Sequence, residues 1–499
     1  MSLWIALPVC AWSVALSFAG GWLQRADLAT SGARGLYLGA VSIALAALGL
    51  WTALATGDVS LRYVATFTSL ELPVVYRLAA FWAGGAGSML FASLALVGCA
   101  ALATWKGRAT HGPLMPWVTG TTAAIVLVVV AATVLTTDPF ARLEWIPTDG
   151  RGLDPLLQHP AMALHPPVLH LGYAATAIPF AFVVAALVTG RLDVVWRGTV
   201  RNWTLIGWVV LTIAIVLGIW WAYDAEGGAG SWQWDPVRNR SLWPWLTSST
   251  LLHLTLAEEQ HGWLRRVSVG LVIATFLLAG VGSAVALGGA TRSAPTFGVG
   301  GWLVWSLAVA LVTSVALVAL RWQSLGLHPD AEGVPAPRRR PLGAHFAHAG
   351  AVILLAALAG TAVREEHEVT LADGGRLETT DPYGRAWTFT SDGMSRYATV
   401  GREVVAIALV PAREGRVFPV LTSELREHFD SHGHLAFPPT TGVGTSTTIL
   451  QDVTLALERT IGDRAVVRVA FNPLAAWVWV GGGLMAIGGL LALSGRVAR

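Results

Sequence analysis

The chain has 499 residues, of which 54% are hydrophobic and only 13% are charged, and its formal net charge is +3. Soluble domains carry about 25% charged residues, so this composition excludes a water-soluble globular protein and indicates a chain that mostly faces lipid. We expect no nucleic-acid partner, because no basic stripe runs along the sequence. Cys10 and Cys99 lie in apolar runs and form no CxxC pair, which excludes a dithiol redox motif.

A membrane-spanning helix needs about 20 mostly apolar residues. The hydropathy pattern therefore predicts an all-α polytopic membrane protein with about 11 transmembrane helices. The seventh of these spans is the shortest. The predicted spans cover residues 3–23, 36–56, 82–104, 118–137, 166–189, 203–222, 242–257, 267–287, 301–321, 343–363 and 474–493.

The distribution of basic residues orients these spans. One alternate set of short loops and tails holds about twice as many Arg and Lys residues as the other set, which assigns it to the cytoplasm. The N-terminus is then outside and the C-terminus inside. The first apolar run follows no basic leader, so we interpret it as a retained span and not as a cleaved signal.

Three regions follow from the pattern. Residues 1–363 are predicted to form a helical core, and residues 473–499 a last span with a cytoplasmic tail. Between them, segments such as "GREVVAIALVP" and "VTLALERTIGDRAVVRVAF" alternate polar and β-branched residues. Residues 364–472 are therefore predicted to be a small β-rich domain, and the topology places it outside the membrane.

The stretch "GSWQWDPVRNRSLWPWL" carries unusually many tryptophans, and it follows the pair Trp220 and Trp221. Tryptophan favours the membrane interface, so an aromatic belt is one interpretation. However, these indoles gather around glycines and an Asp-Pro turn, whereas belt residues scatter over helix ends. A dense indole surface with arginines beside it also suits a large flat ligand that bears carboxylates, such as a porphyrin.

Several segments resemble cytochrome c assembly proteins. "WDPVRNRSLWPWL" is similar to the tryptophan-rich WWD signature of that family, and other blocks resemble the CcmF-type cytochrome c haem lyase in particular, of which this chain looks like a shortened member. These blocks occur in the family's order along most of the chain. They are "YVATFTSLELPVVYRLAAFWAGGAGSML", "DPFARLEWIPTDGRGLDPLLQHPAMALHPPVLHLGY", "LGAHFAHAGAVIL" and "FNPLAAWVWVGGGLMAIGGLLAL".

The resemblance implies a function in cytochrome c biogenesis. Haem would be presented on a periplasmic tryptophan platform, at about residues 220–245, for thioether attachment to the CxxCH motif of apocytochrome c. The expected location is the bacterial inner membrane, with a periplasmic N-terminus and a cytoplasmic C-terminus. The expected partners are apocytochrome c, a CcmE-type haem chaperone, CcmH-type assembly subunits and the lipid bilayer.

Two histidines match in depth on the residues alone. His253 lies near the cytoplasmic end of the seventh predicted span and His348 near the cytoplasmic start of the tenth. Two imidazoles at one depth can act as the axial ligands of a haem iron, although two unrelated buried histidines are an alternative. The resemblance places a transmembrane haem b on this pair, and His345 lies one helical turn from His348.

The resemblance assigns the remaining site residues as well. His165 would ligate the delivered haem, although a histidine that caps the helix is an alternative. Trp232, Trp234 and Asp235 would form the stacking platform, with Trp220 and Trp221 at its membrane edge. We expect Arg238, together with Arg240, to meet the haem propionates.

The sequence also departs from the family pattern. Pro295 stands where a second outer-face histidine is expected, and the family's His-Glu is replaced by Gly85 and Ala86. Ser231 replaces a tryptophan and Arg238 a glutamate, and a block of about four spans is missing. His159, His170 or His367 are candidates to replace the lost ligand. These losses leave open a non-catalytic haem-handling or haem-export subunit that needs a partner chain, and more remotely a transporter without haem.

Overall fold

The computed structural model describes residues 2–191, 195–225, 239–257, 264–289, 299–326, 341–399, 401–429 and 433–494. The chain is a polytopic helical membrane protein with a β-rich region near its C-terminus, as the hydropathy pattern predicts.

Within the described residues, ten helices are long and apolar enough to cross a membrane. A helix also forms at the seventh predicted span, but α10 has only 16 residues. The ten long helices are α1 (Ser2–Trp22), α2 (Ala26–Thr56), α5 (Gly85–Gly107), α6 (Met115–Ala132), α7 (Pro160–Thr189), α8 (Val195–Ala225), α11 (Leu264–Gly289), α12 (Val299–Leu320), α13 (Pro341–Thr361) and α14 (Ala475–Ser494), and the shorter α10 covers Leu242–Ala257.

Several of these helices extend beyond the predicted spans, because hydropathy detects only their apolar part. Helix α2 ends at Gly57 and helix α7 at Gly190, and both glycines adopt the left-handed conformation that terminates a helix. Helix α7 begins at Pro160 with His159 as its N-cap, so Pro166 lies inside the helix and not at its start. The extra turns contain the more polar residues at the helix ends, such as Asp27 in the first turn of α2.

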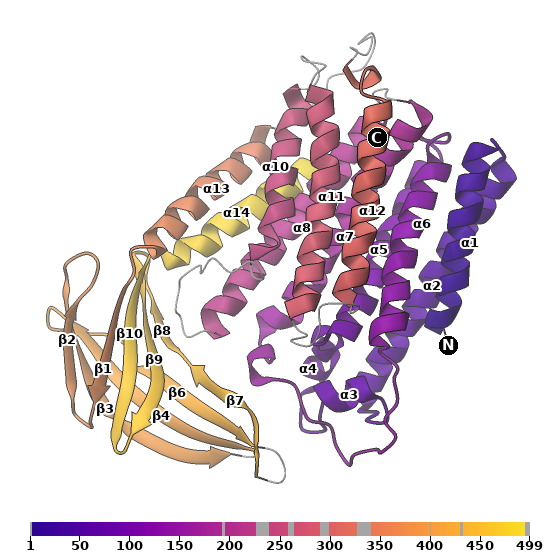
Figure 1. Ribbon diagram of the computed structural model, residues 1–499. Helices are drawn as coiled ribbons and strands as arrows, with labels where there is room; N and C mark the ends of the chain where they lie inside the picture. Colours follow the sequence, from indigo (N-terminus) through magenta and orange to yellow (C-terminus); the bar gives the residue numbers. More distant parts are fainter. Residues whose placement is uncertain are drawn as a thin grey trace.

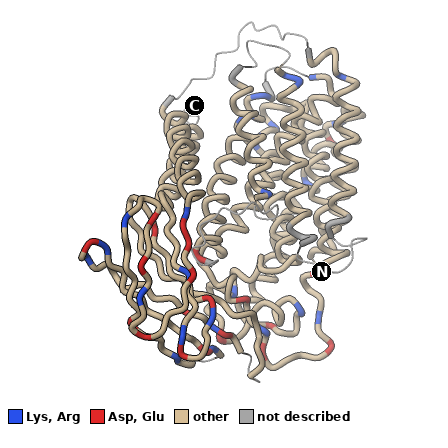
Figure 2. Tube along the Cα trace, turned by 60° about the vertical axis from the view of Figure 1, so that its left-hand side comes forward, with Lys and Arg blue, Asp and Glu red and all other residues tan. Residues whose placement is uncertain are grey.

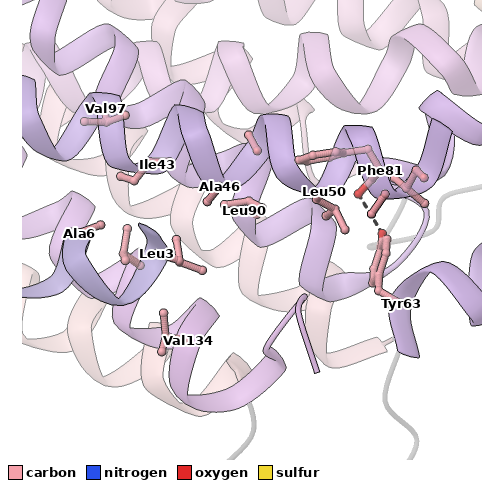
Figure 3. Close-up of a cluster of buried hydrophobic side chains, with 14 of the residues drawn as sticks. Leu3, Ala6, Ile43, Ala46, Leu50, Tyr63, Phe81, Leu90, Val97 and Val134 are labelled. Carbon is pink, nitrogen blue, oxygen red and sulfur yellow. Dashed lines mark hydrogen bonds between the residues drawn. The ribbon is translucent and has the colours of Figure 1, made fainter. Parts of the chain in front are cut away.

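The N-terminal helices share an apolar core to which α1, α2, α5 and α6 contribute (Figure 3). Leu50 and Leu90 are completely buried in it. The Tyr63 hydroxyl, on the short helix α3 (Arg62–Phe67), donates to the carbonyl oxygens of Ala80 at 2.9 Å and Phe81 at 2.8 Å. This bond ties the connection between α2 and α5 to the core. The other short pieces are α4 (Val74–Ala79), η1 (Ala80–Trp82), η2 (Thr133–Thr137), η3 (Pro155–Leu157) and η4 (Ser324–Gly326).

In the described part of the chain, ten antiparallel strands form two sheets, in the orders β1-β10-β9-β8 and β2-β3-β4-β6-β7, with β5 paired to β4. Their inner faces share one apolar core, in which Phe389 and Phe471 come from different sheets. The strands are β1 (Glu365–Leu371), β2 (Arg376–Thr380), β3 (Ala386–Thr399), β4 (Arg402–Arg413), β5 (Arg416–Val417), β6 (Leu421–Phe429), β7 (Leu435–Gly442), β8 (Gly444–Thr447), β9 (Gln451–Ile461) and β10 (Arg464–Pro473).

The sheets and the N-terminus lie at the same end of the helical bundle (Figure 1). Charged residues gather in the sheets and at the ends of the helices, and the middle of the bundle is almost free of them (Figure 2). This separation is what a bilayer requires, because an ionised side chain in the hydrocarbon is costly.

Helices α13 and α14 pack closely together at the edge of the bundle. A Cβ added to Gly350 would lie only 2.6 Å from the carbonyl oxygen of Gly481 and from the backbone nitrogen of Met485. Only glycine fits this position. Helix α14 in turn packs on α8, so α8 and α14 set the position of α13.

One buried carboxylate organises the start of the six-stranded sheet. Asp381 is 2% exposed and accepts hydrogen bonds from Arg385 Nε at 2.8 Å, Trp387 Nε1 at 3.0 Å and Gln451 Nε2 at 3.0 Å. Burial alone would raise the pKa of Asp381, but these donors outweigh it and lower the pKa to about 2. Because Gln451 belongs to the other sheet, the carboxylate also joins the two sheets.

We expect Asp381→Asn to destabilise the β-rich region by about 1–3 kcal/mol at pH 7. The lowered pKa stabilises the fold above the ordinary carboxyl pKa of about 3.9, and this contribution is lost as the pH falls towards 2. Hydrogen exchange of the β3 amides in the full-length protein measures it. The difference between wild type and variant should shrink below pH 4, and a difference independent of pH would contradict the assignment.

Candidate functional site

Two histidines meet where α10 faces α13. The Nε2 atoms of His253 and His348 lie 3.4 Å apart, and the two ring planes stand at 85° to each other. Both side chains are exposed, so they line an open face of the helical bundle and are not part of its packed core. The structure therefore brings together the two residues that the sequence matched by depth.

The hydrogen bonds of the two rings define which nitrogen carries the proton. His253 Nδ1 lies 2.7 Å from the Ser249 carbonyl oxygen, and His348 Nδ1 lies 2.7 Å from the Ala344 carbonyl oxygen. A carbonyl oxygen only accepts, so each Nδ1 donates its proton. In the neutral form each Nε2 then carries a lone pair, and two lone pairs face each other without a proton between them.

A metal ion fits this arrangement chemically, because imidazole binds metals through a free lone pair whose other ring nitrogen donates to a carbonyl. Metal–imidazole distances are about 2.0–2.1 Å, so a shared ion needs the two Nε2 atoms to separate slightly from 3.4 Å. No cluster of three or more His, Cys, Asp or Glu side chains occurs in the described part of the chain. Among the described residues, the donors that meet at this point are the two imidazoles.

Residues of α8 and α14 pack against the neighbours of the two histidines on α10 and α13. Trp208 on α8 is 8% exposed, and its Nε1 donates to the Ser249 hydroxyl at 2.8 Å. Ser249 in turn holds His253 through its carbonyl oxygen. Trp245 stacks on Trp208 with ring centroids 5.9 Å apart. Trp245, the last tryptophan of the stretch, thus lies on α10 and packs against α8.

His165 lies on α7, against the opposite half of α8. Its Nδ1 donates to the Ala214 carbonyl oxygen at 2.7 Å, which leaves Nε2 as an acceptor or ligand. A Cβ added to Gly218 would lie 2.9 Å from His165 Cε1, so the ring rests on the bare backbone of Gly218. Gly218 is followed within one helical turn by Trp220 and Trp221.

These two tryptophans are anchored through their indole nitrogens. Trp220 Nε1 donates to Asp224 Oδ2 at 2.8 Å, and Trp221 Nε1 donates to the Leu156 carbonyl oxygen at 2.9 Å. The same Asp224 oxygen lies 3.1 Å from His159 Nε2, and the His159 ring meets the Trp220 ring edge to face. Asp224 therefore fixes both Trp220 and the start of α7.

The hydrogen bonds of His159 occupy both of its ring nitrogens, which weakens its case as a replacement haem ligand. Its Nδ1 accepts the Ala161 amide at 3.1 Å, so Nε2 carries the proton and donates to Asp224. Both nitrogens are engaged. His170 Nδ1 donates to the Pro166 carbonyl at 2.6 Å. His367 lies on β1, with Nε2 4.0 Å from Glu365 Oε2.

The end of α8 is also tied to the β-rich region. The Tyr223 hydroxyl donates to Asp452 Oδ2 on β9 at 2.7 Å, and its ring meets Trp479 of α14 edge to face. Asp452 is 2% exposed, and burial raises the pKa of this carboxyl although Tyr223 donates to it. The sequence pattern alone did not identify Tyr223, Asp224 or Asp452. The spacing of Trp220 and Asp224, which lie one helical turn apart, is the feature of the sequence that indicates their contact.

Several predicted site residues fall outside the described residues. They are Trp232, Trp234, Asp235 and Arg238, together with Ser231 and Pro295. Arg240 is among the described residues. Arg240 and Tyr173 both lie next to Gly282, since a Cβ added to Gly282 would be 3.1 Å from the Tyr173 hydroxyl and 3.4 Å from Arg240 Cβ. Asp224 and Arg240, which flank the tryptophan-rich stretch in the sequence, thus both lie near α7.

Known proteins resemble this chain in sequence and in fold. Residues 82–282 match the family model "Cytochrome C assembly protein". The chain is 38% identical over 277 residues to the cytochrome c-type biogenesis protein ccl1 of Rhodobacter capsulatus, covering 56% of this chain and 42% of that protein. It is 35% identical over 258 residues to CcmF of Escherichia coli, covering 52% of this chain and 40% of that protein. The matched regions thus span less than half the length of these relatives.

A solved structure titled "Cytochrome c Heme Lyase CcmF" has the same fold. The TM-score is 0.79 at 21% sequence identity, and the match covers 98% of this chain and 96% of that chain. Both the helical bundle and the β-rich region are therefore part of one known architecture.

Tyr223→Phe should loosen the end of α8, because it removes the hydrogen bond from α8 to the buried Asp452 carboxylate and leaves Thr447 as a donor to that carboxylate. A loss of about 1–3 kcal/mol corresponds to about 5- to 150-fold faster amide exchange in the last turn of α8. The matched control is Tyr397→Phe, whose exposed hydroxyl donates to Glu424 at 3.0 Å. The control should leave the α8 amides unchanged, and equal effects of both variants would contradict the contact.

Proposed function

We propose that this chain, of which residues 82–282 match the cytochrome C assembly protein family model, is a haem lyase subunit of cytochrome c biogenesis. The substrates are haem and an apocytochrome c, and two thioether bonds form when the cysteine thiols of CxxCH add across the haem vinyl groups. The chain itself brings no exposed thiol, since Cys10 is buried and Cys99 is half-buried. The thiols therefore come from the apocytochrome.

The observation that carries this proposal is the pair of facing imidazoles. His253 and His348 present two lone pairs to one point and can hold a haem b iron between them. When bound, haem b supplies one-electron transfer. The chain's own part is to fix both rings through backbone carbonyls and to hold α13 against α14 at Gly350.

We place delivery of the substrate haem at the other half of α8. His165 offers Nε2 as a ligand, and Trp220 and Trp221 form the membrane edge of the platform on which Trp232 and Trp234 stack the porphyrin. Asp235 orients Arg238 and Arg240 towards the propionates. This face is periplasmic in the proposed inner-membrane topology, beside the β-rich region.

The proposed partners follow from the reaction. Haem arrives on a CcmE-type chaperone, and the reduced apocytochrome is held by CcmH-type subunits. A non-catalytic haem-handling or export subunit is the second candidate, favoured by the proline at position 295 and by the short match to the relatives. A solved chain of nearly the same extent, titled as a haem lyase, favours the first.

Removing either ligand should remove haem b. We expect His253→Ala and His348→Ala each to reduce the haem content of the purified protein about tenfold or more, because one axial bond is lost. The pyridine haemochrome spectrum measures this. The control is His345→Ala, one turn away on the same helix. If both ligand variants keep a wild-type spectrum, the ligand assignment is wrong.

The delivery site is tested separately by Gly218→Ala. The added methyl would displace the His165 ring from the Ala214 carbonyl, so covalent haem attachment should fall about tenfold while haem b stays bound. The assay is haem staining of a reporter cytochrome c in cells that lack their own lyase. Gly198→Ala, on the same helix with no atom within 4 Å of the new methyl, is the control. Failure of the wild-type chain to restore attachment would favour the second candidate.

A further inference from the structure

A groove opens between α1 and α2. These two helices lie at the edge of the bundle opposite α13 and α14 (Figure 1). The groove's volume of about 460 Å³ is within the roughly 300–1,000 Å³ of small-molecule sites. Mostly apolar side chains line it, with one hydroxyl and one cation. The lining residues are Pro8, Val9, Trp12, Ser31, Arg34 and Leu38.

The groove exists because the two helices touch at glycine. A Cβ added to Gly35 would lie 3.1 Å from Ser13 Cβ and 3.2 Å from Trp12 Cδ1. The backbones therefore meet at the floor, and the larger side chains stand to either side. Trp12 is 57% exposed and Leu38 60% exposed, so they form walls that face lipid.

Arg34 makes no side-chain hydrogen bond, ion pair or ring contact with the residues that the structure describes. The acidic residue in the first turn of α2, Asp27, is paired with Arg25. Arg34 lies eight residues after Ala26, about 12 Å along the helix axis, and two residues before the predicted span of residues 36–56. At this end of the span its guanidinium can reach the level of the lipid headgroups, where the phosphates of anionic lipids lie.

We propose that this groove binds an anionic phospholipid. The lipid phosphate accepts hydrogen bonds from the Arg34 guanidinium, whose planar fork suits phosphate oxygens. One acyl chain lies along Pro8, Val9 and Leu38, and the Trp12 indole covers it. The chemistry favours a lipid over free phosphate, because only a lipid fills the apolar part. The site is remote from His253 and His165 and is independent of the proposed function.

The test uses the full-length protein in neutral detergent, with native mass spectrometry to count bound lipids. The probes are phosphatidylglycerol, phosphatidylcholine with the same acyl chains, and glycerol phosphate without chains. The variants are Arg34→Gln, Arg34→Lys and Val9→Trp, which fills the groove. Arg191→Gln, an exposed arginine near the same end of the bundle, is the control.

We expect phosphatidylglycerol to bind the wild-type protein and Arg191→Gln with equal affinity. It should bind Arg34→Gln about tenfold more weakly. Arg34→Lys should retain part of the affinity, and Val9→Trp should lose binding with the charge intact. Equal retention by Arg34→Gln, or equal binding of phosphatidylcholine, would overturn the proposal. Binding of glycerol phosphate as tight as the lipid would show a phosphate site and contradict the lipid.

Discussion

When two imidazole rings each donate their Nδ1 proton to a carbonyl oxygen, their Nε2 lone pairs cannot form a hydrogen bond with each other. His253 and His348 are in this position, with their Nε2 atoms 3.4 Å apart. The rings are fixed by the helix backbone, so they cannot turn away without breaking a hydrogen bond in a medium where lost bonds are not replaced by water. The arrangement is therefore favourable only with a proton or a metal ion between the two nitrogens.

Helix α8 connects this pair to the rest of the molecule. Its inner half carries Trp208, which reaches His253 through Ser249. Its outer half carries Gly218, against which His165 packs, and then the anchored Trp220 and Trp221. One rigid helix thus sets the separation between the proposed haem b site and the proposed delivery site. The Tyr223–Asp452 bond extends the same frame to the β-rich region.

The sequence predicted the helical spans and the strands well, because both depend on local patterns of apolar residues. The matched depth of His253 and His348 also followed from the position of each residue in its span. Asp224 and the Tyr223–Asp452 contact were missed, since they join residues that are distant in the chain or sit in an unremarkable polar context. The helix ends were misplaced at α7, where His159 caps a helix that begins before its apolar run. The role of His159 as a cap and as a donor to Asp224 depends on tertiary contacts that no hydropathy pattern contains.

The central claim is that His253 and His348 together ligate one haem iron. Electron paramagnetic resonance of the oxidised, purified full-length protein tests it most directly, because axial ligation determines the spin state of ferric haem. The account predicts a low-spin signal in the wild-type protein that converts to high spin, or disappears with the haem, in His348→Ala. A low-spin signal that persists unchanged in His348→Ala would contradict it.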